Sequence, residues 1–446
     1  MSLAPSPSTP SVPPLFFEAP SIGRPIPRVP LRPDAFDNVP DLPNAPARSM
    51  DPAPSSSTTN VSAPPVGNLA RRIHGWTWQA FPIGMGTGAV YTVLSGIKGR
   101  PPALISIETA FYFLNIALFL LNTSTLLLQA ILYPRQSRRL LTDPSKNIFV
   151  PLVVLSFATI IIGTVNYAVP SGHFSANDIY ILFWLYVSFA MLVSFPLLMI
   201  WFNQPHDIRT FTPAWAFLVF PLMLVGVVAF KVLSVMDPAD TRSVGVLVVG
   251  YFFQGIGFFV TMFYICIYII RIMTTGFMDG HQANGAFVAC GPPGFTAFAL
   301  INLGQQAQKI LPLHNLISPL AGEVFFASSV LSGLLLFGLA VFLFVFGVLP
   351  YWFKLHKHLS EILGCWALTF PNVGWISTLR ALGDTLNIPG FYVVHVVMAT
   401  IMCITWLVLF VLTGLAFYRG KIFFAKPEDV LKDEVGGDKD SEKGYP

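Results

Sequence analysis

Long apolar segments separated by short polar ones dominate residues 76–418 of this chain. A helix needs about 20 mostly apolar residues to cross the hydrocarbon core of a bilayer. The segments that meet this length have the approximate bounds 76–97, 109–133, 148–168, 179–202, 212–232, 243–270, 285–304, 322–349, 361–379 and 391–418. The pattern predicts an all-α integral membrane protein with ten transmembrane helices, arranged as five helical hairpins.

Proline occurs inside every odd-numbered segment, whereas among the even-numbered ones only the fourth contains it, as Pro196. A proline removes a helical hydrogen bond, and at membrane depth the freed carbonyl is tolerated only where protein or a water-filled cavity satisfies it. We therefore predict five kinked inner helices around a central passage, ringed by five outer helices that face lipid or other subunits. The expected kinks are at Pro82, Pro221, Pro292, Pro293 and Pro371.

Composition and charge agree with a membrane location. The chain of 446 residues is 54% hydrophobic and 11% charged, whereas a soluble domain is roughly 25% charged. Placing both termini in the cytosol leaves thirteen basic residues on that side of the segments and six on the other. Because cytoplasmic loops carry the excess of Lys and Arg, both termini are predicted to be cytosolic.

The two ends of the chain differ from its centre. Residues 1–70 are rich in Pro, Ser, Ala and Thr, a composition that buries too little apolar surface to fold, so we predict a disordered cytosolic tail. Residues 421–446 are charged and are expected to form a solvated cytosolic tail. Residues 71–420 then form the transmembrane transport domain.

Charged side chains are confined to the ends of the apolar segments, as with Glu108, Lys231 and Arg380. We therefore expect no buried carboxylate, which argues against a proton relay within the spans. A passage without fixed negative charge does not repel anions, although each hydroxyl in it could instead bond to its own helix. The neutral residues predicted to line the substrate pathway are Thr87, Thr159, Thr164, Asn166, Thr296, Thr369, Asn372 and Ser377.

Two further residues of the ninth segment are candidates for function. Arg380 ends this segment on the non-cytosolic side, where it could draw a carboxylate into the pathway or simply anchor the helix at the membrane surface. Phe370 directly precedes Pro371, and an aromatic ring at a kink of an inner helix can close a pore by excluding water. Phe370 is therefore the predicted gate.

The apolar segments contain no arrangement typical of an enzyme. Of the eight histidines only His395 lies within a segment, and no nucleophile or set of metal ligands occurs at a matching depth. We predict a transporter without cofactor or metal, whose partners are the lipid bilayer and an anion rather than nucleic acid. The alternatives are a membrane-embedded enzyme and a receptor or scaffold whose tails bind other proteins.

Several motifs, in this order along the chain, resemble the tellurite-resistance/dicarboxylate transporter family, which has the fold of the plant slow anion channels. They are FPIGMGTGA, TPAWAFLVFPLMLVG, GPPGFTAFALINLG and WALTFPNVGW. The resemblance covers roughly residues 70–420. It implies a homotrimer in which each subunit has its own pore of five inner helices, and an occluding phenylalanine that corresponds to Phe370.

Within that family, GPPGFTA and FPNVG are most similar to the fungal C4-dicarboxylate/malic acid branch. This resemblance implies a plasma-membrane transporter of C4-dicarboxylates such as malate or succinate, with a neutral, Phe-gated central pore. The alternative within the family is a sulfite efflux pump or a small-anion channel.

Overall fold

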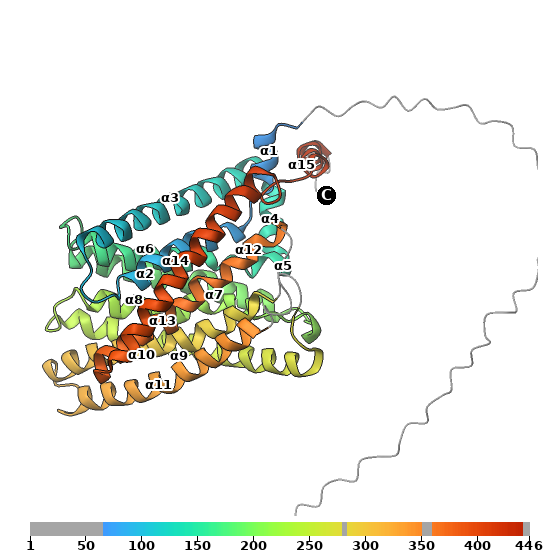
Figure 1. Cartoon of the computed structure of the whole chain (residues 1–446). Coiled ribbons are helices and arrows are strands. Elements are labelled where there is room, and N and C mark those ends of the chain that lie inside the picture. Colours follow the sequence, from blue (N-terminus) through green and yellow to red (C-terminus); the bar gives the residue numbers. More distant parts are fainter. Residues whose placement is uncertain (1–65, 279–282, 350–358, 440–446) are drawn as a thin grey trace, which may run out of the picture. The chain divides into compact units, whose positions relative to one another are not determined.

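The computed structural model describes residues 66–278, 283–349 and 359–439, and each regular element in these ranges is a helix (Figure 1). Residues 1–65 of the expected N-terminal tail lie outside this description. Eight helical stretches are long and apolar enough to cross a membrane. They are α3 (Pro102–Leu132), Pro144–Ala168, α7 (Ala176–Phe202), α9 (Thr241–Thr275), α10 (Gly285–Leu313), α11 (Ala321–Val348), Ile362–Leu386 and α14 (Pro389–Tyr418). The protein is therefore a multi-pass membrane protein.

The first and fifth expected spans contain shorter helices. These are α2 (Phe81–Leu94) and α8 (Phe220–Leu233), each of 14 residues. A helix of that length covers about 21 Å, less than the roughly 30 Å of a hydrocarbon core. Each is preceded by a 3₁₀ turn, η1 (Trp78–Ala80) or η4 (Pro213–Leu218). The described residues thus contain eight helical stretches long and apolar enough to span a membrane and two shorter helices, so ten transmembrane helices are not confirmed.

Five helices close a ring. Helix α2 packs on α6 (Leu152–Gly163), α6 on α8, α8 on α10, α10 on α13 (Phe370–Leu386), and α13 again on α2. The three full-length spans in this ring are 72%, 78% and 83% buried. In α2 and α8 all residues are buried except Pro82 and Lys231. The ring is therefore the interior of the domain.

The remaining five long helices lie outside the ring. Each packs on the ring helix before it and on the ring helix after it in the chain, so that α3 touches α2 and α6, and α14 touches α13 and α2. Their most apolar stretches are only 17% to 33% buried. Large apolar side chains such as Phe259 and Leu335 are exposed on them, as lipid-facing residues are. Buried and exposed helices thus alternate along the chain as the prolines predicted.

Most of the expected kink prolines stand at a helix start. Pro82, Pro221 and Pro371 are each the second residue of an α-helix that follows a short 3₁₀ turn. Proline is tolerated there because the first N–H groups of a helix have no internal partner. Pro292 and Pro293, in contrast, lie inside the continuous helix α10.

Glycine allows close contact between ring helices. A Cβ added to Gly294 of α10 would lie 2.7 Å from the backbone nitrogen of Trp375 in α13, and one added to Gly86 of α2 would lie 2.6 Å from Thr369 Oγ1. Because backbone cannot move aside as a flexible side chain can, Gly294 sets the spacing of α10 and α13.

The chain after α14 returns to the start of the domain. Helices α1 (Asn68–His74), α4 (Pro134–Thr142) and α15 (Pro427–Lys439) lie at the same end of the bundle (Figure 1). Asp433 accepts a hydrogen bond at 2.9 Å from Arg139 and lies 2.8 Å from His74 Nε2. Val430 is fully buried against Ile73. The first part of the segment 421–446 is therefore packed on the transmembrane domain.

We expect Gly294→Ala to destabilise the protein, because the added methyl group forces α10 and α13 apart. Overpacking of this kind costs about 1–3 kcal/mol, which should lower the apparent melting temperature of the purified protein in detergent. Gly338→Ala is the matched control, since a Cβ at Gly338 of α11 meets nothing within 4 Å. Equal melting temperatures for the two variants would contradict this explanation of the α10–α13 contact.

Candidate functional site

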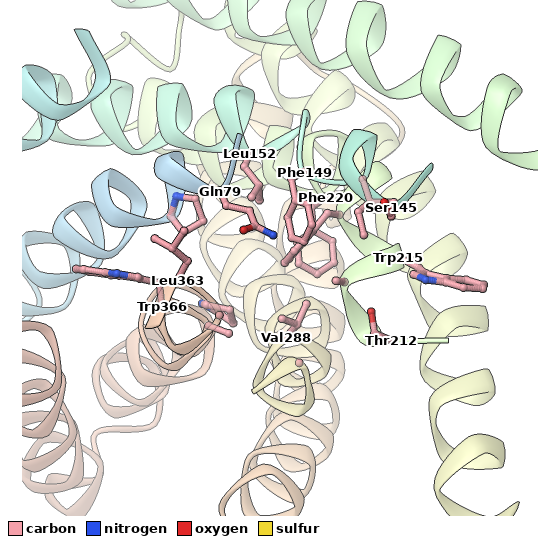
Figure 2. Close-up of a pocket in the computed structure, with 18 of the residues that line it drawn as sticks. Gln79, Ser145, Phe149, Leu152, Thr212, Trp215, Phe220, Val288, Leu363 and Trp366 are labelled. Atoms are coloured by element: carbon pink, nitrogen blue, oxygen red, sulfur yellow. The ribbon is translucent and has the colours of Figure 1, made fainter. Parts of the chain in front are cut away.

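A cavity of about 650 Å³ opens where the five ring helices begin. Each ring helix contributes a residue from its first or second turn: Pro82 of α2, Leu152 of α6, Phe220 of α8, Val288 of α10 and Phe370 of α13. In Figure 2, Leu152, Phe220 and Val288 surround the same space. We call this cavity the vestibule. The vestibule thus lies at the end of the ring where its helices start.

Phe370 lines the vestibule. It is the first residue of α13, is only 5% exposed, and its ring lies 5.0 Å from the ring of Phe295 in α10. Among the described residues, the vestibule wall extends no further along α13 than Phe370 and Pro371. Phe370 thus marks the limit of the vestibule on α13.

Three of the predicted pathway hydroxyls connect the ring to outer helices. Thr87 donates to the carbonyl of Ile83 and accepts from Trp406 Nε1 of α14 at 3.1 Å. Thr159 and Thr164 likewise donate to carbonyls of their own helix, Ser156 at 2.6 Å and Ile160 at 2.9 Å. Both also contact α3 side chains, because Thr159 accepts from Asn115 at 2.9 Å and Thr164 lies 2.9 Å from the Tyr112 hydroxyl. These hydroxyls already have protein partners.

The predicted pathway residues of α10 and the ninth segment differ in how they are bonded. Thr296 accepts from Gln254 Nε2 of α9 at 2.8 Å, and Thr369 donates to the carbonyl of Trp366 at 2.7 Å. Asn372 donates to the carbonyl of Leu368 at 2.8 Å and accepts from Trp375 at 2.9 Å. Ser377 Oγ, in contrast, is buried and has no hydrogen-bond partner among the described residues. Of this group, Ser377 is the residue whose hydroxyl has no partner among the described residues.

Asn166 and Arg380 lie where the ring helices end, far along the chain from the vestibule residues of the same helices. Asn166 is in η2 (Thr164–Ala168), which continues α6, and its amide is 3.5 Å from Ser95 Oγ just after α2. Arg380 donates to Asp384 at 2.5 Å and to the carbonyl of Gly96 at 2.9 Å. We call this end of the ring the far mouth. The structure thus separates the predicted site residues into a vestibule group, a bonded middle group and a far-mouth group.

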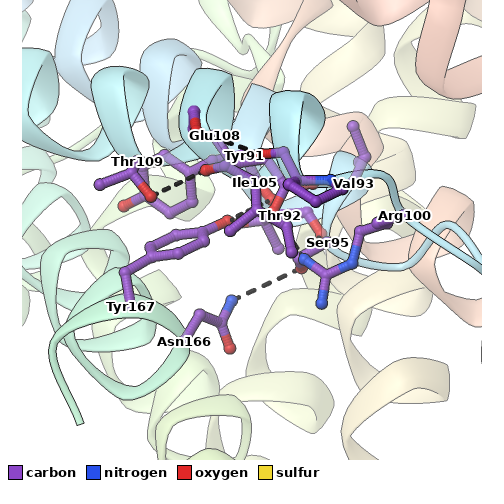
Figure 3. A network of polar contacts seen from close by, with 12 residues as sticks. Tyr91, Thr92, Val93, Ser95, Arg100, Ile105, Glu108, Thr109, Asn166 and Tyr167 are labelled. Atoms are coloured by element: carbon purple, nitrogen blue, oxygen red, sulfur yellow. Dashed lines mark hydrogen bonds and ion pairs between the residues drawn. The ribbon is translucent and has the colours of Figure 1, made fainter. Parts of the chain in front are cut away.

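The expectation that no carboxylate is buried in the spans is wrong for Glu108. Helix α3 begins at Pro102, before the apolar segment, so Glu108 falls in its second turn and is fully buried. It pairs with Arg100 at 2.6 Å and accepts from the Tyr167 hydroxyl at 3.0 Å (Figure 3). A carboxylate can be buried when such partners balance its charge.

Sequence reasoning also missed Asp384 and Phe220. Asp384 follows Arg380 by four residues, a spacing that places oppositely charged side chains together on a helix and could have identified the pair. Phe220 precedes Pro221 as Phe370 precedes Pro371, and both phenylalanines line the vestibule. The repeated Phe-Pro dipeptide was therefore a signal for both.

The described residues contain no group of three or more His, Cys, Asp or Glu side chains placed to hold a metal ion. The chemistry that the arrangement offers is instead that of a passage. A largely apolar chamber has Phe370 in its wall, a buried hydroxyl without a partner among the described residues lies further along the same helix, and basic side chains lie at the far mouth.

Comparison with known proteins gives a consistent result. A malic acid transport protein of Schizosaccharomyces pombe is 28% identical over 375 residues, which cover 83% of this chain and 85% of that relative. A second S. pombe protein whose name refers to malic acid transport is 26% identical, with coverage of 82% and 85%. A sulfite efflux pump of Trichophyton rubrum is 24% identical, with coverage of 76% and 89%. These relatives are named as transport proteins or pumps and not as enzymes.

The family model described as voltage-dependent anion channel, SLAC1, matches residues 75–414. This range contains the whole ring, the vestibule and the far mouth. The protein therefore belongs to the SLAC1 family of voltage-dependent anion channels.

Proposed function

We propose that this protein is a plasma-membrane transporter that moves C4-dicarboxylates such as malate along the axis of its ring. The observation that carries the proposal is the vestibule, whose wall takes one or more residues from the start of each of the five ring helices. A chamber built in this way leads into the space that the ring encloses. Family membership supports anion transport, and the relatives named for malic acid transport support the choice of substrate.

The direction of the ring helices also favours an anion. Helices α2, α6, α8, α10 and α13 all begin at the vestibule, so the partial positive charge of five helix N-termini is directed towards it. Such termini attract anions, as they do in the half-helices of secondary transporters. In this proposal, the helix N-termini raise the local concentration of anions in the vestibule, and the anions then move through the neutral interior of the ring.

The proposal also includes the number of spans, the orientation in the membrane and the assembly of subunits. We take α2 and α8, each with its preceding 3₁₀ turn, as the first and fifth of ten spans, which gives five hairpins of one inner and one outer helix. The excess of basic residues supports a cytosolic position for both termini, and the same orientation puts the vestibule on the cytosolic side. The exposed apolar faces of the outer helices suit lipid and the contacts of a homotrimer in which each subunit has its own pore.

We expect Phe370→Ala to increase malate flux, because it removes the ring between the vestibule and the rest of the pathway. A reduction of the barrier by about 1.4 kcal/mol would raise the rate about tenfold. The measurement is uptake of radiolabelled malate by vesicles that contain the purified protein. Phe259→Ala is the control, since Phe259 lies on the outer helix α9 and is 67% exposed. Unchanged flux in folded Phe370→Ala protein would remove Phe370 as the gate.

The sulfite efflux relatives make sulfite export the second candidate function. We expect vesicles containing the wild-type protein to take up labelled malate faster than labelled sulfite, with protein-free vesicles as the control. Repeating both measurements with and without a pH gradient would show whether transport is linked to protons. Flux of sulfite without flux of malate would overturn the dicarboxylate assignment and leave the alternative.

A further inference from the structure

Basic side chains lie at the far mouth, and three of them pair with carboxylates. Arg380 at the end of α13 pairs with Asp384, which also lies 3.1 Å from Lys98. Arg100, in the connection between α2 and α3, pairs with the buried carboxylate of Glu108. The guanidinium groups of the far mouth therefore have counter-charges within the protein.

Lys231 differs from these arginines. It is the only residue of α8 that is half-buried rather than buried, and it lies near the end of that helix. Its Nζ donates to Asn166 Oδ1 at 3.3 Å, and within the described parts of the chain no carboxylate lies within ion-pair distance of it. An amide oxygen carries only a partial charge, so the ammonium group remains without a counter-ion.

The neighbours of Lys231 come from the ends of other ring helices. Asn166 contacts both Lys231 and Ser95, which directly follows α2. Figure 3 shows the contact between Asn166 and Ser95, with Arg100 nearby. Arg380 of α13 reaches the same end of α2 through the carbonyl of Gly96. These contacts thus connect the ends of α8, α6 and α2 with α13.

An anion that leaves the ring at the far mouth meets the C-terminal ends of the ring helices. The free carbonyls there carry partial negative charge and oppose it. A cation at this position offsets the carbonyls and stabilises the anion. Lys231 has the required charge and position, and its partner Asn166 adds an N–H donor.

We propose that Lys231 and Asn166 form a binding site for one carboxylate group of the transported anion, with Lys231 as its counter-ion. The site rests on the proposed function and adds to it the residues that hold the substrate at the far mouth. The ammonium and the Asn166 amide each donate to a carboxylate oxygen. Binding is weak enough for release, because a pathway that holds its ion tightly does not conduct it.

The test is malate uptake by vesicles containing the Lys231→Met variant. Loss of a charged hydrogen bond is expected to raise the KM for malate about tenfold, with a much smaller change in maximal rate. Lys231→Arg keeps the charge and should restore most of the affinity. Lys309→Met is the matched control, because Lys309 is an exposed lysine of the ring helix α10 and should leave the KM unchanged.

A second variant keeps Lys231 but gives its ammonium group a carboxylate partner within the protein, so that it can no longer pair with the substrate. Asn166→Asp places a carboxylate beside Lys231, so the new ion pair should stabilise the fold while it repels the substrate and raises the KM. This variant decides the matter if Lys231→Met fails to fold. A wild-type KM for malate in folded Lys231→Met protein would overturn the site. If only Asn166→Asp folds, a wild-type KM in that variant would do the same. In both cases the proposed malate transport would be unaffected. Absence of malate uptake by the wild-type protein would instead overturn the proposed function.

Discussion

A backbone carbonyl that has lost its hydrogen bond cannot face hydrocarbon, and this constraint determines which helices of the protein lie inside. The helical path is broken before α2, α8 and α13, each time next to a Phe-Pro dipeptide, and the pair Pro292–Pro293 removes N–H donors inside the continuous helix α10. These helices, together with α6, form the closed ring. The unbroken helices satisfy their own backbone and can face lipid. The division into inner and outer helices therefore follows from backbone hydrogen bonding more than from side-chain polarity.

The broken helices also produce the vestibule. Because each ring helix begins beyond a turn or proline and all five run in the same direction, their first residues converge around one space. Apolar side chains such as Leu152 and Val288 line that space, while the helix N-termini supply partial positive charge. A chamber of this kind attracts anions without binding them through a fixed charge. Weak, shared attraction suits a passage better than a tight site.

Polar side chains in the interior serve two different purposes. Thr87, Thr159 and Thr296 bond to side chains of outer helices and so hold the inner and outer layers together. At the far mouth, Glu108 and Asp384 balance the arginines, whereas Lys231 contacts the neutral side chain of Asn166. The described ring helices thus carry neutral polar groups in their middle part, and their charged side chains lie towards the ends.

The sequence by itself determined the membrane location, the alternation of inner and outer helices and the position of Phe370 beside a helix break, because hydropathy and proline positions are local properties of the chain. The tertiary structure decided which polar groups already have a hydrogen-bond or ion-pair partner within the protein. Whether Thr87 faces the axis or Trp406, and whether Glu108 is exposed or buried against Arg100, depends on how each helix is rotated and on what packs beside it. Those neighbours are distant in sequence or lie beyond the apolar segment, so hydropathy could not reveal them. The same reason explains why Arg380 was identified without its partner Asp384, and why Lys231 was treated only as the end of a span.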